Sequence, residues 1–432
     1  MALYKRAIFL SGKINILYDS AVFVSRTRMH KILTLVCILI PSMALADGYW
    51  ERIITMAQKH PSFEAMRSVE LSSQSLGDIE KARRFPVVSG TLSRVDGSST
   101  LTQTSDAIQA GIAVTYPLFD NDEQVARDAI ATAQGRLEYA ESVASFDAAT
   151  ASIANAYIDL WRAYQIKSLF EQSLLSVNEL MERVEAALVE GEGSFIDQAF
   201  LMEHKMALSA SLLDVKLEIA QAKEVWPSAD LEKTVWLLPD MKELGYVLGD
   251  NSALAQTKEE LALKQAELKL AHSEDGLSVD LNAALLKRQF SEGDDSTDFT
   301  WALAATYPLF DGGFIDSKIK RQSFLVKSKA KELGLIEYQQ RQALTNQAFF
   351  IESKNSYIKE KAAHCDRLND LLAKTKERYA LGKGQVKEVL DVDLKANDCH
   401  ADVLTAHSDV YKAFNDVSRL NGTFGYFAGL AR

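Results

Sequence analysis

Two cysteines are the residues of this 432-residue chain whose spacing points most directly to chemistry. Cys365 stands 17 residues before Gly382, and Cys399 stands 17 residues after it. If Gly382 marks the turn between two antiparallel helices, both thiols lie at matching height, about 25 Å from that turn. We therefore predict a disulfide that staples the two helices together. The alternative is a pair of small, buried, apolar cysteines, which is common in packed proteins.

A metal site is the second chemistry that these residue types allow. His364 and His400 directly neighbour the cysteines, but adjacent residues of a helix point to different faces, so we expect no zinc site. His204, His272 and His407 are isolated on helical stretches, and we interpret them as surface or packing residues. The chain has no glycine-rich phosphate loop and no nucleophile elbow. We therefore expect no enzyme activity and no cofactor.

The elements that would position the cysteines belong to an internal duplication. The hexapeptide TYPLFD occurs twice, and its tyrosines are 191 positions apart. A pair of glycines, in EGEG and again in LGKG, recurs at the same separation. Two landmarks with one spacing define a repeat. The repeated markers are Tyr116 and Tyr307, Gly191 and Gly382, and Gly193 and Gly384.

Each repeat is predicted to contain, in order, a helix, a strand, a loop, a strand, a helix, a tip and a helix. We place the first repeat at residues 47–225 and the second at 251–422. Residues 226–250 form a linker around the middle of the helices, and 423–432 form a C-terminal tail. The polar-apolar patterns and the low count of 7 prolines are typical of long helices.

Alternating apolar residues predict one β-hairpin in each repeat. Leu277 to Leu285 and Phe299 to Tyr307 alternate with polar or small residues, and Ile108 to Tyr116 does the same. The segment from Phe85 to Arg94 is a weaker match. Runs of about ten residues fit a tilted membrane strand. The alternative is a half-buried hairpin of a soluble sheet.

The stretch from Asn121 to Gly191 contains no proline and predicts a helix on the order of 100 Å long. Its apolar residues, and those from Val389 to Leu420, recur at steps of three and four, which is coiled-coil spacing. Proline in TYPLFD lacks an N–H donor, so we expect it where a strand ends. The aspartate that follows is expected to cap the next helix.

Two hairpins supply only four strands, which cannot close a barrel. An open sheet edge is not tolerated in lipid, so a membrane location requires several copies to pool their strands. Three copies would give twelve strands. If the strands instead face water, the chain is a soluble periplasmic coiled-coil adaptor or structural protein. Such an adaptor is expected to have one hairpin and a compact β-domain.

The N-terminus is typical of a Sec-type signal peptide. From Met29 a short basic region is followed by the apolar run Ile32 to Ile40 and a small-x-small sequence that ends at Ala46. We expect cleavage after Ala46 and interpret residues 1–28 as an upstream extension. The alternative is that they form an unusually long basic region of the signal peptide. The mature chain then lies in a compartment that permits disulfides. Its net charge of −11 gives no electrostatic footprint for nucleic acid.

These features together resemble the TolC family of outer-membrane channel proteins. The residues that carry the resemblance are the duplicated hairpins, YPLFD with Gly312-Gly313 after the second copy, and RYALGKGQVKEVLDVD from Arg378 to Asp393. It covers about residues 50 to 422. The implied fold is mainly α with membrane β. In it, a homotrimer forms a twelve-stranded transmembrane β-barrel in outer-membrane lipid and a helical barrel that projects into the periplasm.

The resemblance also implies a function and partners. The family forms the passive exit duct of tripartite efflux pumps or type I secretion systems. The expected partners are a periplasmic adaptor protein and an inner-membrane transporter of the RND or ABC type. The sequence does not separate drug efflux from protein secretion.

Candidate site residues follow from the family's positions. Glu388 and Asp391 match an acidic entrance ring, and their i, i+3 spacing puts them on one helix face. The alternative is a solvated acidic face. Asp197 and Tyr379 match a link that holds the closed state. The family's basic partner falls at a glycine here, and the neighbouring Lys383 is its expected substitute. The tips that would contact the adaptor are Gly191, Glu192, Gly193, Gly382, Lys383 and Gly384.

Overall fold

The computed structural model describes most of the chain after the expected signal peptide. The cleavage position at Ala46 and the tail 423–432 lie outside the described residues. The chain divides into the units Met1–Gly48 and Tyr49–Arg432, and all contacts below lie within the second unit. The described residues are 48–95, 107–226, 236–239, 248–290 and 295–422.

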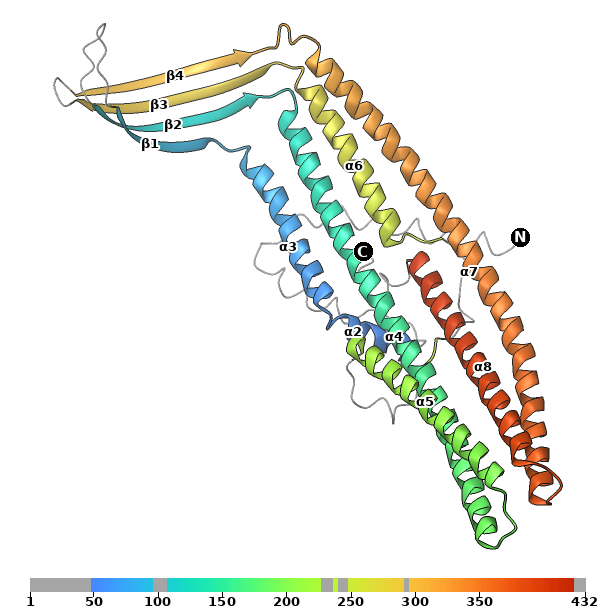
Figure 1. Cartoon of the computed structure of the whole chain (residues 1–432). Coiled ribbons are helices and arrows are strands. Elements are labelled where there is room, and N and C mark those ends of the chain that lie inside the picture. Colours follow the sequence, from blue (N-terminus) through green and yellow to red (C-terminus); the bar gives the residue numbers. More distant parts are fainter. Residues whose placement is uncertain (1–47, 96–106, 227–235, 240–247, 291–294, 423–432) are drawn as a thin grey trace, which may run out of the picture. The chain divides into compact units, whose positions relative to one another are not determined.

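The elements follow the predicted order, and both repeats contain one very long helix (Figure 1). The long helices α4 and α7 have 67 residues each, which corresponds to about 100 Å. The first half contains α2 (Gly48–Ala57), α3 (Pro61–Ala82), β1 (Val87–Val95), β2 (Ala107–Phe119), α4 (Glu123–Val189) and α5 (Phe195–Val225). The second half contains α6 (Ser252–Ser273), β3 (Ser278–Phe290), β4 (Ser296–Thr306), α7 (Phe314–Ala380) and α8 (Val386–Leu420).

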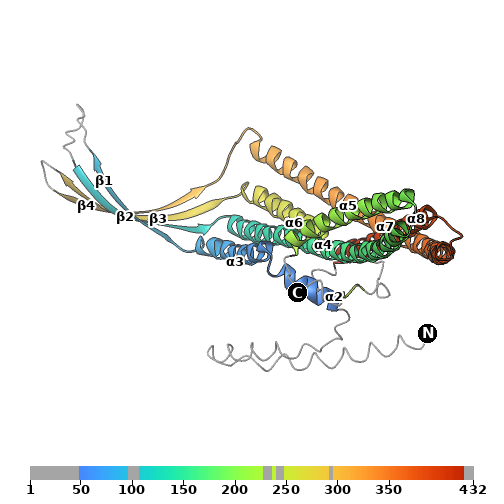
Figure 2. The same ribbon diagram turned by 60° about the horizontal axis from the view of Figure 1, so that its bottom comes forward.

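The four strands form a single antiparallel sheet in the order β1-β2-β3-β4. The two predicted hairpins are therefore joined edge to edge through β2 and β3. β1 and β4 are the outer strands of this sheet. In both views the strands extend beyond the ends of the helices, and no described helix covers either face (Figures 1 and 2).

The register confirms the period of two that the sequence predicts. Ile112 lies opposite Leu285, and Leu285 lies opposite Phe299, so the three side chains share one face. This apolar face carries the exposed residues Val88, Leu92, Ile108, Ile112, Leu285, Phe299, Trp301 and Leu303. The opposite face carries Ser89, Thr91, Ser93, Gln109, Thr115, Asp280, Asn282, Arg288, Asp298 and Thr300.

The two TYPLFD segments differ in where the strand ends. β4 ends at Thr306, before the proline, as predicted. β2 instead continues to Phe119, and its register with β3 shifts between Pro117 and Phe119. The prediction that the strand ends at proline is therefore wrong for the first copy. Proline removes one donor from the ladder, and a bulge lets pairing resume after it.

The side chains of both TYPLFD aspartates accept hydrogen bonds from the start of the next helix, although the N-cap residues themselves are Asp122 and Gly313. Asp120 Oδ2 accepts a hydrogen bond of 2.9 Å from the backbone N–H of Gln124. Asp311 accepts two, at 2.8 Å from the N–H of Gly313 and 2.6 Å from the N–H of Ile315. These bonds satisfy donors that the first helical turn leaves free.

Helix α6 begins where α8 ends, so the two together run alongside α7. The Asn251 side chain makes the joint. Its Nδ2 donates to the carbonyl of Leu420 at 3.0 Å, and its Oδ1 accepts from the N–H of Leu254 at 3.1 Å. Gly249 is required beside this joint, because a Cβ there would lie 1.9 Å from the carbonyl oxygen of Asn421.

An aromatic core fills the middle of the helical region. The Tyr157 ring packs at 5.1 Å from Trp226 and 5.2 Å from Trp236, and its hydroxyl accepts the N–H of Leu237 at 3.2 Å. Four of the five tryptophans pack in this core: Trp50, Trp161, Trp226 and Trp236. Trp301 alone lies on the sheet. The linker residues that the structure describes therefore dock on the middle of the helices.

Candidate functional site at the hairpin tips

The tips of the two helical hairpins have the same backbone geometry. Gly191 and Gly382 adopt φ of 80° and 71°, a left-handed conformation that glycine takes without steric cost. The N–H of the next residue, Glu192 or Lys383, bonds at 2.9 Å to the carbonyl five residues earlier. This arrangement ends a helix with its last carbonyls satisfied. The duplication therefore preserves the turn itself.

The second glycine of each tip is held by close backbone packing. A Cβ at Gly193 would lie 2.5 Å from the backbone nitrogen of Leu188. At Gly384 the corresponding distance to the nitrogen of Tyr379 is 3.3 Å. The tip backbone therefore favours glycine at position 384, where the family resemblance implies a basic side chain.

The acidic pair lies exposed on α8 near the second tip. Glu388 and Asp391 both face solvent in the single chain. Arg378 Nη1 approaches Glu388 Oε2 at 3.8 Å, and both side chains are about half exposed. Water and salt screen such a pair strongly, so it contributes at most about 1 kcal/mol. The entrance ring itself stays a prediction, because it requires further copies of the chain.

The two residues of the predicted gate link, Asp197 and Tyr379, influence each other electrostatically. Burial raises the pKa of the Tyr379 hydroxyl, the negative charge of Asp197 raises it further, and Arg183 acts in the opposite direction. No hydrogen bond joins the Asp197 and Tyr379 side chains in the described part of the chain. Lys383 is exposed, and its carbonyl accepts a hydrogen bond of 3.3 Å from Arg378 Nη2. Sequence reasoning missed both arginines.

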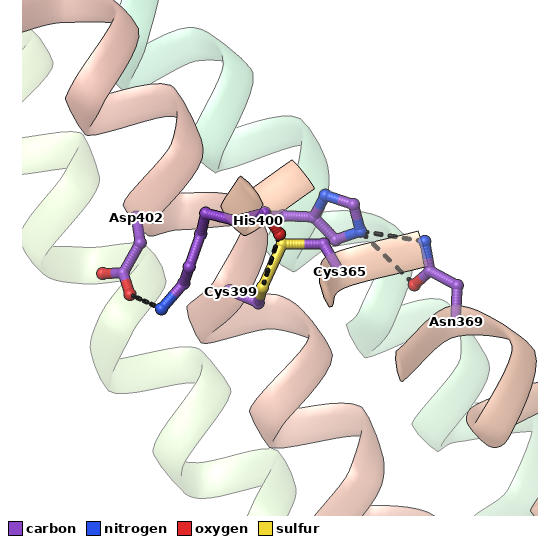
Figure 3. Close-up of a disulfide and its surroundings, with 6 residues drawn as sticks. Cys365, Asn369, Cys399, His400 and Asp402 are labelled. Atoms are coloured by element: carbon purple, nitrogen blue, oxygen red, sulfur yellow. Dashed lines mark hydrogen bonds and ion pairs between the residues drawn. A yellow bond between two sulfur atoms is a disulfide. The ribbon is translucent and has the colours of Figure 1, made fainter. Parts of the chain in front are cut away.

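Cys365 and Cys399 are joined by a disulfide between α7 and α8 (Figure 3). Their Cα atoms are 5.6 Å apart, within the range that the predicted pairing requires. Both residues are buried. The α7–α8 hairpin is therefore one covalently closed body.

Polar contacts flank the disulfide on both sides. Toward the sheet, Lys361 Nζ lies 2.9 Å from Asp402 Oδ2. Toward the tip, Asn369 Nδ2 lies 2.9 Å from His400 Nε2 (Figure 3). The imidazole of His400 therefore contacts the side-chain amide of Asn369. Among the described residues, no cluster of histidine, cysteine and carboxylate side chains has metal-binding geometry.

A buried polar cluster lies between the disulfide and the tips. We call it the Asp393 network. One carboxylate oxygen, Asp393 Oδ2, accepts the hydroxyl of Ser173 at 2.5 Å and the amide of Asn397 at 3.0 Å, and lies 3.3 Å from His204 Nε2. Asn397 Nδ2 also donates to Ser173 Oγ at 3.0 Å. The network joins α4, α5 and α8.

The surroundings keep Asp393 charged. Burial alone would raise the pKa of this carboxyl group, but the hydrogen bonds from His204 and Ser173 and the positive charge of Lys376 outweigh it. The pKa therefore lies below its ordinary value. Lys376 comes from α7, and its Nζ donates to Ser176 Oγ at 2.7 Å.

Two interpretations from the sequence are corrected here. His204 is neither isolated nor merely a packing residue, because it is buried against Asp393. The sequence pattern predicts an apolar stripe on α8 through Val389, Val392 and Ala396. The buried stripe instead passes from Val389 through Asp393 to Ala396, and Val392 is only partly buried. The sequence did contain a signal for this network, because Asp393 is a charged residue at a core position of the coiled-coil spacing.

The fold is that of outer-membrane channel proteins. Solved structures with this fold align with 87% of the chain at 13–17% identity, so the likeness concerns the fold. The resemblance to the TolC family is confirmed at that level. Neither a family model nor a curated protein sequence matches the chain.

Three of these structures illustrate the match. The open state of the MtrE outer membrane channel of Neisseria gonorrhoeae aligns with a TM-score of 0.74, 16% identity and 89% coverage of its chain. The CmeC outer membrane channel of Campylobacter jejuni gives 0.73, 13% and 86%. The outer membrane protein VceC of Vibrio cholerae gives 0.71, 17% and 96%. None of the described helices has the length and apolar composition needed to cross a bilayer.

Replacing both cysteines by serine (Cys365→Ser with Cys399→Ser) is expected to lower the free energy of unfolding by about 3 kcal/mol, because the disulfide closes a loop of 34 positions. The free energy of unfolding is measured by guanidinium titration of the mature protein in detergent. A reductant should weaken the parent by a similar amount and leave the double variant unchanged. Equal stability of the parent with and without reductant would contradict the prediction.

The stabilising effect of Asp393 is expected to depend on pH. Because its folded-state pKa is lowered, the stabilisation is complete above the unfolded pKa of about 3.9 and is lost as pH falls through the folded value. Unfolding of the parent and of Asp393→Asn at pH 7, 5 and 3 tests this. The difference between the two proteins should shrink at pH 3. A difference that grows on acidification would refute it.

Proposed function

We propose that the mature protein is a homotrimeric channel of the outer membrane. It would be the passive exit duct of a tripartite efflux pump or a type I secretion system. The observation that carries this proposal is the sheet, which exposes a largely apolar face and has an outer strand at each side.

The apolar face of the sheet is suited to lipid. Leu92, Phe299 and Trp301 are 79%, 68% and 69% exposed in the single chain, and no described helix covers them. Burying such side chains stabilises a protein by roughly 1.5–3 kcal/mol each, so leaving the whole face in water is unfavourable. The four strands, of 9 to 13 residues, also have the length that a tilted bilayer crossing requires.

A band of exposed aromatic residues lies where the sheet meets the helices. Phe85 precedes β1, Phe119 ends β2, and Tyr307 and Phe310 follow β4. Their exposed fractions range from 51% to 91%. Aromatic girdles at this level are typical of membrane β-barrels, where the rings lie among the lipid head groups. The band therefore supports placing the membrane boundary at the strand–helix junctions.

The outer strands explain why one chain is not enough. β1 and β4 each pair on one side only in the described sheet. Unpaired backbone donors and acceptors are not tolerated in lipid, so β4 of one copy must pair with β1 of the next until the sheet closes. Three copies close a barrel of twelve strands, which lies within the known range of even-numbered barrels.

The helices present a matching surface for neighbouring copies. The side of α5 opposite its buried residues carries an apolar stripe in which Met206 and Leu213 are each 68% exposed. On α7, Phe349 is 72% exposed. Stripes of this spacing pack against another helix. The α5 stripe consists of Phe195, Met202, Met206, Leu213 and Leu217.

The tips are the parts of such a trimer that would meet a periplasmic adaptor, which in turn would link the channel to an inner-membrane transporter of the RND or ABC type. The proposed contacts are the tips Gly191 to Gly193 and Gly382 to Gly384. We propose no catalytic role, no cofactor and no nucleic-acid partner. The alternative, a soluble periplasmic adaptor, would leave the apolar face of the sheet in water.

The assembly is tested by the mass and compartment of the mature protein. Outer membranes extracted in mild detergent are expected to contain a trimer, measured by light scattering. A matched variant, Phe299→Lys with Trp301→Lys, puts charge on the apolar face and should reduce membrane insertion strongly. A water-soluble monomer or dimer in the periplasmic fraction would overturn the proposal.

The acidic ring is tested by ion selectivity. In a trimer, Glu388 and Asp391 place six carboxylates around one entrance, so planar-bilayer recordings should show a preference for cations over anions. Glu388→Gln with Asp391→Asn should reduce that preference several-fold, because the fixed charge attracts cations electrostatically. The control, Glu190→Gln with Glu192→Gln, removes the same charge from the first tip. Equal effects of both pairs would contradict a specific ring.

A further inference from the structure

Near their tips, the two helical hairpins of one chain are held together by both apolar and polar contacts. Within the second hairpin, the disulfide fixes α7 to α8. Between the hairpins, an apolar cluster that includes Val177, Leu201 and Val389 fills the space near the tips. Between the disulfide and the tips, the described hydrogen bonds between hairpins come from the Asp393 network and from Lys376 to Ser176.

These two kinds of contact constrain motion in different ways. Apolar packing is not directional, so helices joined by it alone tolerate small sliding and tilting. Hydrogen bonds to a buried charge are directional, and a shift that breaks them leaves Asp393 unpaired in an apolar stripe at high cost. A single polar residue at a core position is known to fix helix register in this way.

The geometry concentrates this restraint on one atom. Asp393 Oδ2 is approached by Ser173 of α4, His204 of α5 and Asn397 of its own helix. Each of the network residues is at most 8% exposed, so water does not compete for these bonds. The titratable groups that face the carboxylate are His204 from α5 and Lys376 from α7, whereas α4 contributes the hydroxyl of Ser173.

We propose that the Asp393 network is a latch that holds the α7–α8 hairpin against the α4–α5 hairpin and so keeps the channel entrance narrow. The inference rests on the proposed channel function. It assigns to Asp393, Ser173 and His204 a positioning role separate from the exposed residues at the tips. When the network is broken, the disulfide-linked hairpin moves away as one body and the entrance widens.

The first test is single-channel conductance of the purified protein in planar bilayers. Asp393→Asn and Ser173→Ala each remove a charge-assisted hydrogen bond, and should raise the ratio of open to closed states by roughly tenfold. The matched control is Asp402→Asn, which removes a carboxylate of α8 that pairs only within its own hairpin, with Lys361. Its ratio should equal that of the parent.

The second test measures the movement itself. Spin labels on Glu192→Cys and Lys383→Cys report the separation of the two tips, and the native cysteines do not react because they are paired. In trimers diluted with unlabelled chains, the distance distribution should shift to longer values in Asp393→Asn and stay unchanged in Asp402→Asn.

The outcomes separate the latch from the channel proposal. If the parent forms no channel, the proposed function fails, and the spin-label distances still decide whether the network restrains the tips. If the parent conducts and both Asp393→Asn and Ser173→Ala match it in conductance and distance, the latch is overturned. If Asp393→Asn fails to assemble, Ser173→Ala decides the result, because it retains the buried charge.

Discussion

The unpaired backbone groups along β1 and β4 are the constraint on which the rest of the molecule depends. The outer strands of this sheet need backbone hydrogen-bond partners, and its apolar face needs an apolar surrounding. A single chain in lipid cannot satisfy the outer strands. In the proposed trimer, the strands of three copies are arranged around one axis, and the helices that continue from them must follow the same axis. Helices as long as α4 and α7 then bury their apolar stripes against neighbours along their whole length, and no globular core is needed.

The sequence predicts the features that repeat along the chain. The doubled TYPLFD, the alternation from Phe299 to Tyr307 and the glycines at 191 and 382 each act through local backbone chemistry. Period-two and coiled-coil patterns can be recognised in a sequence because side chains at the same position of every pleat or turn face the same environment, either solvent or packed protein. Cys365 and Cys399 were pairable for the same reason, since an antiparallel hairpin maps equal sequence distances from its tip onto equal heights.

The features that the sequence does not predict depend on partners distant in the chain. Asp393 interrupts an apolar stripe, and only the fold shows that Ser173 and His204 lie opposite it. Arg378 begins the motif that carries the family resemblance, but only the fold shows that its guanidinium approaches Glu388. Pro117 shows the limit from the other side. Proline lacks a backbone N–H donor, as the sequence implies. Whether β2 continues beyond Pro117 depends on its pairing with β3, which the local sequence does not specify.

The equal lengths of α4 and α7 have a consequence for how such a chain can change over time. Both helices have 67 residues between a capped start and a glycine turn of one geometry. One inserted residue would rotate everything beyond it by about 100° and advance it by about 1.5 Å. Ser173 would then leave Asp393, and the turn at Gly191 would shift relative to the turn at Gly382. An insertion or deletion in one of these helices is therefore tolerable only when a matching change occurs in the helices packed against it. A substitution affects only the contacts of its own position.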